Sequence, residues 1–147
     1  MLRAFKTISI IVGGLLLGAC ASHLSYSEMQ ALMPPKPADK GRIYFYRESA
    51  FIGNLITPDI VVNGKIVGVS NPGTFFYIDR EPGNYEVICG MGILNQTGFA
   101  LAAGQDVYVR TAPGTGSIVK STMVTEVVDL PTAIPAIHDL KYAAAAK

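Results

Sequence analysis

The sequence contains little of the side-chain chemistry on which enzymes most often depend. It has no tryptophan, two cysteines and two histidines in 147 residues. Two cysteines exclude a disulfide-dense scaffold. The histidines, His23 and His138, lie near opposite ends of the chain, whereas a metal site needs three or four rigidly held ligands. We therefore expect neither a metal nor another cofactor, and the sequence offers no candidate catalytic residue.

The sequence also has no excess of either positive or negative charge. The 12 basic and 11 acidic residues give a formal net charge of +1, and no block of like charges occurs. Proteins that bind nucleic acid usually carry a basic patch that neutralises phosphates, so we expect no nucleic-acid partner. Half of the residues are hydrophobic and 16% are charged, which excludes a disordered chain.

The longest apolar run is too short to cross a bilayer as a helix. It covers thirteen residues, Thr7 to Ala19, and a helix of that length spans about 20 Å against the ~30 Å of a hydrocarbon core. Arg3 and Lys6 precede it, and small residues end it. This order is typical of a secretory signal peptide, predicted here over residues 1–19. An uncut N-terminal membrane anchor is the alternative.

The end of that segment, Leu17-Gly18-Ala19-Cys20, resembles the lipobox of bacterial lipoproteins. The resemblance implies cleavage before Cys20, a diacylglyceryl group on its sulfur and an acyl chain on its new amino group. A thiolate is a suitable nucleophile for that thioether bond. In Gram-negative lipoproteins, Asp after the lipidated cysteine tends to retain the protein at the inner membrane. Ala21 and Ser22 follow here, so the resemblance implies the outer membrane, facing the periplasm.

The rest of the chain divides into a spacer, a β domain and a tail. Residues 20–41 are predicted to be the lipidated cysteine and a Pro-rich tether, with Ser27 capping two helical turns; a Pro-rich docking ligand is the alternative. Residues 129–147 are predicted to be a frayed tail, which a short helix after Pro135 would interrupt.

Residues 42–128 have the period-two pattern of strands separated by turn residues. Asn63-Gly64 between two apolar runs indicates a hairpin, because both turn positions need positive φ. The fold class is therefore all-β, as an antiparallel β-sandwich of seven or eight strands, with a small barrel as the alternative. The expected strands are Arg42–Glu48, Asp59–Val62, Lys65–Val69, Thr74–Asp79, Tyr85–Cys89, Thr97–Ala102, Gln105–Thr111 and Ser117–Val128.

Four segments in this order resemble a family of small bacterial lipoproteins that is catalogued as a domain of unknown function. They are Gly41–Arg47 (GRIYFYR), Val62–Gly68 with VNGK and VG, Phe76-Tyr77, and Pro82–Tyr85 (PGNY). The resemblance extends from Gly41 to Thr111. The layout is also similar to the prealbumin-like sandwiches of carboxypeptidase accessory domains and surface-associated β repeats. The family resemblance implies fold and location, and no binding residues.

Cys89 is the only thiol left if Cys20 is lipidated. It alternates with Val87 and Tyr85 on one strand face, and free cysteines are among the most buried residues, so we expect a core thiol. An exposed thiol would support a redox or metal-handling protein. A small periplasmic hydrolase is the other enzymatic alternative, although no Gly-x-Ser-x-Gly motif accompanies His138-Asp139.

Alternating strand directions place four connections, 49–58, 71–73, 90–96 and 112–116, at one end of the domain. With the tether entering at Arg42, that end is predicted to be distal to the membrane. Two of its loops are apolar, and they either plug the end of the sandwich or bind a partner. The candidate interaction residues are Phe51, Ile52, Leu55, Ile56, Met91, Ile93 and Leu94.

The sequence thus predicts a lipid-anchored envelope lipoprotein whose β module binds a protein or an envelope polymer. It is not expected to be an enzyme.

Overall fold

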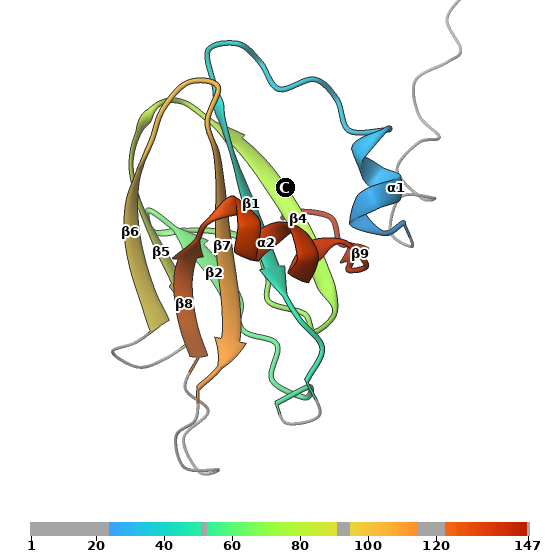
Figure 1. Cartoon of the computed structure of the whole chain (residues 1–147). Coiled ribbons are helices and arrows are strands. Elements are labelled where there is room, and N and C mark those ends of the chain that lie inside the picture. Colours follow the sequence, from blue (N-terminus) through green and yellow to red (C-terminus); the bar gives the residue numbers. More distant parts are fainter. Residues whose placement is uncertain (1–23, 51–52, 91–94, 115–122, 147) are drawn as a thin grey trace, which may run out of the picture.

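The computed structural model describes residues 24–50, 53–90, 95–114 and 123–146, and they form two facing β-sheets with two short helices on one side (Figure 1). The strand order is β8-β7-β1-β4-β9 in the five-stranded sheet and β3-β2-β5-β6 in the four-stranded sheet. The predicted all-β class and sandwich are confirmed, and the sheets formed by the described residues do not close into a barrel.

The strands follow the predicted ranges closely. They are β1 (Gly41–Arg47), β2 (Asp59–Val62), β3 (Lys65–Val69), β4 (Thr74–Arg80), β5 (Gly83–Cys89), β6 (Gln96–Leu101), β7 (Asp106–Pro113), β8 (Met123–Val128) and β9 (Lys141–Tyr142). The hairpin between β2 and β3 is confirmed, because Asn63 and Gly64 both have positive φ, 46° and 78°.

Two strand pairs depart from the expected antiparallel arrangement. β1 pairs in parallel with β7, and β4 pairs in parallel with β9. The chain crosses to the other sheet for β2 and β3, and again for β5 and β6, before β7 returns beside β1. β1 and β7 are both odd-numbered in an alternating sequence of strands, so they point the same way. β9 is a ninth strand, which lies in the segment expected to be a tail.

The central strand β1 is buried along its whole length because both of its faces are covered. Ile43 and Phe45 point into the space between the sheets, and Tyr44 and Tyr46 point to the opposite face. A strand buried on both sides reads as a nearly continuous hydrophobic run, which explains the unusual apolar content of this segment.

The space between the sheets holds the main core, in which Phe45 stacks on Phe76 with ring centroids 5.0 Å apart. Cys89 lies in this core with no exposed surface, as predicted. The other buried members are Ile43, Ile60, Val62, Val67, Ile78, Val87, Leu101, Val107, Val109 and Met123.

The outer face of the five-stranded sheet carries a second core made largely of aromatic rings. Tyr44 stacks on Tyr108 with centroids 4.8 Å apart, and Tyr26 meets Tyr44 and Phe75 edge-on. The helices α1 (Tyr26–Gln30) and α2 (Leu130–Ile137) cover this layer (Figure 1). The rings therefore serve packing on this face of the sheet.

The segment expected to be a tether is docked on the sheet from Leu24 onward. Ser25, and not Ser27, caps α1, and its side chain and Glu28 form a reciprocal capping box. Tyr26 and Met29 are 3% and 5% exposed. Burial of these two side chains against the aromatic layer stabilises a helix that would be too short to persist alone.

The C-terminal segment is also ordered, so the prediction of a frayed tail is wrong. Asp129 caps α2, which starts before Pro135 and contains it. Ile137 and Ala133 are fully buried. Beyond β9, the amide of Ala143 donates to Phe75 in one sheet, and that of Ala146 donates to Val67 in the other. Tertiary packing and these bonds outweigh the weak local helical preference.

Candidate functional site

The strand ends that carry the predicted loops lie together at one end of the sandwich. β1 is antiparallel to β4 and parallel to β7, and β2 is antiparallel to β5. The last residue of β1, Arg47, therefore lies beside the first residue of β4, Thr74. We call this the loop end; of the connections between strands there, the structure describes residues 48–50, 53–58, 70–73, 90, 95 and 114. The predicted clustering of these connections is confirmed by the strand register.

Arg47 is the organising residue of the loop end. It has the same parity as Ile43 and Phe45, so its side chain turns inward, and it is only 2% exposed. One terminal nitrogen donates to the carbonyls of Ile56 at 2.6 Å and Ser70 at 2.8 Å, and the other donates to Gly53 at 2.7 Å. Burial lowers the pKa of the guanidinium. Among the described residues no carboxylate pairs with Arg47, so backbone oxygens alone solvate this charge.

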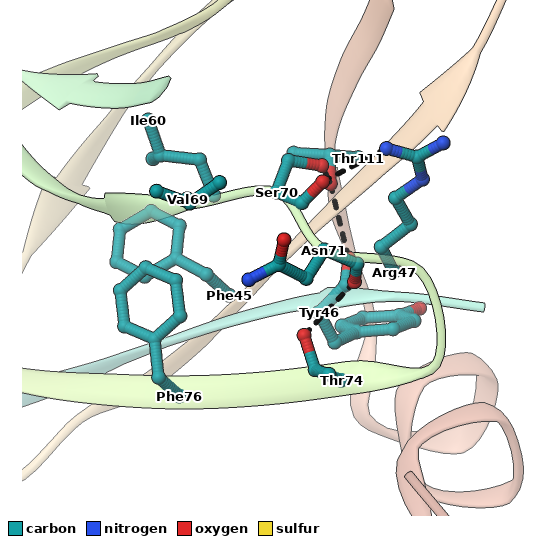
Figure 2. A pocket seen from close by; sticks show the side chains of 10 residues that line it. All are labelled: Phe45, Tyr46, Arg47, Ile60, Val69, Ser70, Asn71, Thr74, Phe76 and Thr111. Carbon is teal, nitrogen blue, oxygen red and sulfur yellow. Dashed lines mark hydrogen bonds between the residues drawn. The ribbon is translucent and has the colours of Figure 1, made fainter. Parts of the chain in front are cut away.

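The hollow beside Arg47 is filled by protein. Figure 2 shows Ser70 and Thr111 at its wall, and their hydroxyl oxygens are 2.8 Å apart. The ring of Phe45 lies on the same wall, and no volume for a water molecule remains. These contacts hold the loops in place and leave no room for a ligand.

The bonds from Arg47 fix the segment Gly53–Ile56 and determine which side chain it presents. Ile56 packs against the main core, as the plug interpretation predicts, whereas the side chain of Leu55 is 99% exposed. Five candidate interaction residues lie outside the described residues: Phe51, Ile52, Met91, Ile93 and Leu94. The lipobox, Leu17 to Cys20, also lies outside them.

A larger cavity, about 500 Å³, opens between the outer face of the five-stranded sheet and α2. Arg110 on β7 forms its charged floor. Arg110 donates to Glu48 and to Glu126, each at 2.8 Å, and these hydrogen bonds, foremost the one to Glu126, raise its pKa. We call these three residues the Arg110 cluster; its net charge is −1. The cavity is lined by Tyr46, Glu48, Arg110, Glu126, Thr132, Pro135 and Ala136.

Tyr46 lines this cavity, but its hydroxyl is buried beneath the surface. Tyr46 is 2% exposed, and its hydroxyl has no hydrogen-bond partner among the described residues. Burial raises the pKa of this phenol, so it remains a neutral donor. An open concave surface with convergent polar groups has the features of a binding site.

Sequence reasoning missed this cavity, because residues 46, 48, 110, 126 and 132 meet only in the fold. One signal was available in the sequence. Arg110 lies on the same strand face as Tyr108, which is expected to be buried, and a charged side chain on a buried face needs partners.

Cys89 and His138, which the sequence analysis considered for a chemical role, lie in different parts of the domain. Burial raises the pKa of Cys89 to about 11, which keeps it a protonated thiol in the core. His138 is at the surface after α2, with its Nδ1 2.7 Å from the carboxylate of Asp139. The described residues contain no group of three metal-ligating side chains. Within the same ranges, no helix is long and apolar enough to cross a membrane.

Residues 37–123, more than half of the chain, match the family described as "Protein of unknown function (DUF2846)". The chain belongs to this family. The resemblance noted from Gly41 to Thr111 is thereby confirmed. The DUF2846 match includes Tyr46, Glu48 and Arg110 but stops at Met123, so the side of the cavity formed by Glu126 and α2 lies beyond the matched range.

A relative from Haemophilus influenzae, described as an uncharacterized protein, is 34% identical over 89 residues. The match covers 58% of this chain and 52% of the relative, so the chain spans about half the length of the curated relative that it matches. No solved structure matches the chain.

Proposed function

We propose that this DUF2846 protein is a lipid-anchored envelope lipoprotein that binds another envelope component, a protein or a polymer, without catalysing a reaction. The observation that carries the proposal is the sequence Leu17-Gly18-Ala19-Cys20, which resembles a lipobox and follows a short apolar run with Arg3 and Lys6 before it. A lipid at Cys20 would hold the whole domain at a membrane. Ala21 and Ser22 favour the outer membrane, facing the periplasm.

Anchoring by Cys20 is supported by the way the chain joins the domain. The amide of Tyr142 donates to the carbonyl of Leu24 at 2.8 Å, and the amide of Tyr26 donates to Leu140 at 3.0 Å. The chain from Leu24 onward is thus part of the fold, and a pull on a lipid at Cys20 would be transmitted to a sheet. One acyl chain binds a membrane weakly and reversibly, whereas several chains together make release negligible.

Binding, rather than catalysis, is supported by the state of the polar groups. In the Arg110 cluster both carboxylates are held by the guanidinium, and Cys89 is buried in its protonated form. A cavity of about 500 Å³ with a paired charge cluster at its floor can bind a polar group of a partner. It contains no pair of groups suited to activating a nucleophile.

The lipid is tested by metabolic labelling with an alkyne fatty acid. We expect label on the native protein, no label on Cys20→Ala, and full label on the matched control Cys89→Ala. Whole-protein mass spectrometry should give a mature chain that starts at a modified Cys20. A chain that still carries Met1, or equal labelling of Cys20→Ala, contradicts the proposal.

Binding in the cavity is tested by photo-crosslinking in cells. A photoreactive residue in place of Thr132, which is exposed at the cavity, should give a discrete adduct, and one in place of Lys65 on the other sheet should not. The adduct should disappear with Arg110→Ala. Equal adducts at both positions, or an adduct indifferent to Arg110→Ala, would exclude this cavity as the binding site.

A further inference from the structure

The strand register builds the floor of the cavity at the Arg110 cluster from three neighbouring strands. Tyr46 on β1 pairs with Arg110 on β7, and Arg110 pairs with Glu126 on β8. Glu48 follows Tyr46 by two residues, and its carboxylate also accepts a bond from Arg110. These four side chains therefore form one group on the outer face of the five-stranded sheet, beneath α2.

Each carboxylate of the Arg110 cluster uses only one of its two oxygens. Glu48 accepts through Oε2 and Glu126 through Oε1, each at 2.8 Å. The other oxygen of each group accepts no hydrogen bond from the described residues, and the two side chains are 44% and 45% exposed. The guanidinium thus holds both carboxylates in place and leaves one acceptor on each for a ligand.

The sign of the charge at this cavity favours a cation. Two carboxylates and one guanidinium line it, so the charge of its described lining is −1. Helix α2 carries no charged side chain, and Asp129 and Asp139 lie on either side of it. Lys120 lies outside the described residues and is not counted. Since the carboxylates already neutralise the guanidinium, an anion would be repelled where a cation is attracted.

Tyr46 gives an independent indication that a partner is missing from this site. A hydroxyl buried without a hydrogen bond costs free energy, and the hydroxyl of Tyr46 is in that position. The charges of Glu48, Arg110 and Glu126 all influence the pKa of this phenol, so its hydroxyl lies toward the cluster. A hydroxyl without a partner can turn the negative end of its dipole toward a cation in the cavity.

The size and the remaining wall of the cavity suit an organic cation and not a metal ion. Pro135 and Ala136 of α2 provide an apolar surface for an aliphatic stem. The volume of about 500 Å³ can hold a long side chain. The described residues offer no group of three metal-ligating side chains, whereas Ca²⁺ takes about six to eight oxygen ligands.

We propose that the cavity at the Arg110 cluster binds an aliphatic primary ammonium group, of the kind that a lysine side chain carries. The ammonium donates to the free oxygens of Glu48 and Glu126, and its methylene stem lies against Pro135 and Ala136. This inference rests on the binding function proposed above and names the chemistry that the cavity recognises. A lysine of a protein and an amine of an envelope polymer share this chemistry.

The ligand class is tested by titrating the full-length, lipidated protein in detergent micelles and recording proton–nitrogen correlation spectra. The probe is Nα-acetyl-lysinamide, and its matched control is Nα-acetyl-norleucinamide, which has the same aliphatic stem without the amine. Acetate serves as the anionic probe. We expect the lysine probe to shift the amide signals of Glu126 and Ala136 and not that of Lys65 on the other sheet, and the two control probes to shift none of them. Added salt should weaken the binding.

Charge-removing variants test the two carboxylates. Glu48→Gln and Glu126→Gln each keep an oxygen that can accept from Arg110, and each should weaken binding of the lysine probe roughly two- to fivefold. The double variant leaves only the guanidinium charged and should bind the lysine probe no better than the norleucine probe. Glu86→Gln removes the same charge from an exposed position on β5 and should bind like the native protein. Circular dichroism confirms that the variants are folded.

Three results would overturn the ammonium site: equal shifts from the lysine and norleucine probes, tighter binding of acetate than of the lysine probe, or unchanged affinity in the double variant. The proposed binding function is judged separately, by the adduct at Thr132 in cells. If that adduct forms and the lysine probe does not compete with it, the binding function stands and the ligand class is wrong. Mass spectrometry of the adduct distinguishes the two sources, as a lysine-containing peptide or as a polymer fragment with an amine. A captured fragment without a primary amine would also refute the ligand class.

Discussion

Replacing Arg47 by methionine should unfold the loop end and destabilise the whole domain. Methionine fills part of the volume of the aliphatic stem but provides no donor. Three carbonyl oxygens, of Gly53, Ile56 and Ser70, then lose the bonds that they accept at 2.6 to 2.8 Å. Ser70 is 2% exposed, so water cannot easily replace its bond, whereas the other two oxygens lie on a half-buried segment.

The magnitude follows from these three bonds. A hydrogen bond to a charged group contributes about 1.5–3 kcal/mol. Removal of the guanidinium also relieves the cost of burying a charge that has no carboxylate partner, which offsets part of the loss. We expect Arg47→Met to lower the free energy of unfolding by about 3–5 kcal/mol. The stability of Arg47→Lys should fall between those of the native protein and Arg47→Met, because one ammonium group cannot reach three oxygens on two segments equally well.

The measurement is urea unfolding followed by far-UV circular dichroism, with limited proteolysis of Gly53–Ile56 as a local probe. Arg80→Met is the matched control, since Arg80 is half-buried and makes a single bond to the carbonyl of Asp79; it should change the free energy by less than about 1 kcal/mol. If Arg47→Met were as stable as the native protein, or no more sensitive to protease than Arg80→Met, the assigned role of Arg47 would be wrong.

The remaining predictions address the two cores and the pH dependence of stability. Ile137→Ala should lower the free energy of unfolding in urea by about 2–4 kcal/mol because Ile137 is fully buried. Leu130→Ala on the same helix, at a residue that is 55% exposed, should lower it by less than about 1 kcal/mol. Equal effects of the two substitutions would mean that α2 is not docked. Gly68→Ala should lower the free energy of unfolding by about 1–3 kcal/mol because an added Cβ would overlap the ring of Phe76. Gly98→Ala should leave it unchanged in the same assay, because the nearest atom to an added Cβ there is 3.8 Å away. Cys89 should resist a maleimide at pH 8 until urea is added, and rapid labelling of the folded protein would contradict its burial. The pKa of its thiol is raised from an ordinary 9.0 to about 11, so the folded state binds this proton more tightly; the thiol's contribution is fully present below pH 9, and stability should fall as the pH rises from 9 to 11. Burial also raises the pKa of Tyr44 and Tyr108, so an ultraviolet titration should show these phenols ionising only as the protein unfolds.

The elements that the sequence determined by itself are those set by local chemistry. Alternation of side chains specified the strands of the sandwich, and Asn63-Gly64 specified its hairpin because these residues adopt positive φ at little steric cost. Alternating strand directions also sufficed to predict that four connections share one end. The burial of Cys89 followed from its parity with Val87 within a single strand.

The tertiary structure alone decided the state of the two flanking segments. Nothing within Tyr26–Gln30 or Leu130–Ile137 makes a stable helix, and the second contains Pro135. Each helix forms because it covers tyrosine and phenylalanine side chains from β1, β4 and β7, which are distant in the sequence. Their docking moves the attachment of the chain from Arg42 to Leu24. It also creates the cavity above Arg110, because both depend on contacts between residues far apart along the chain.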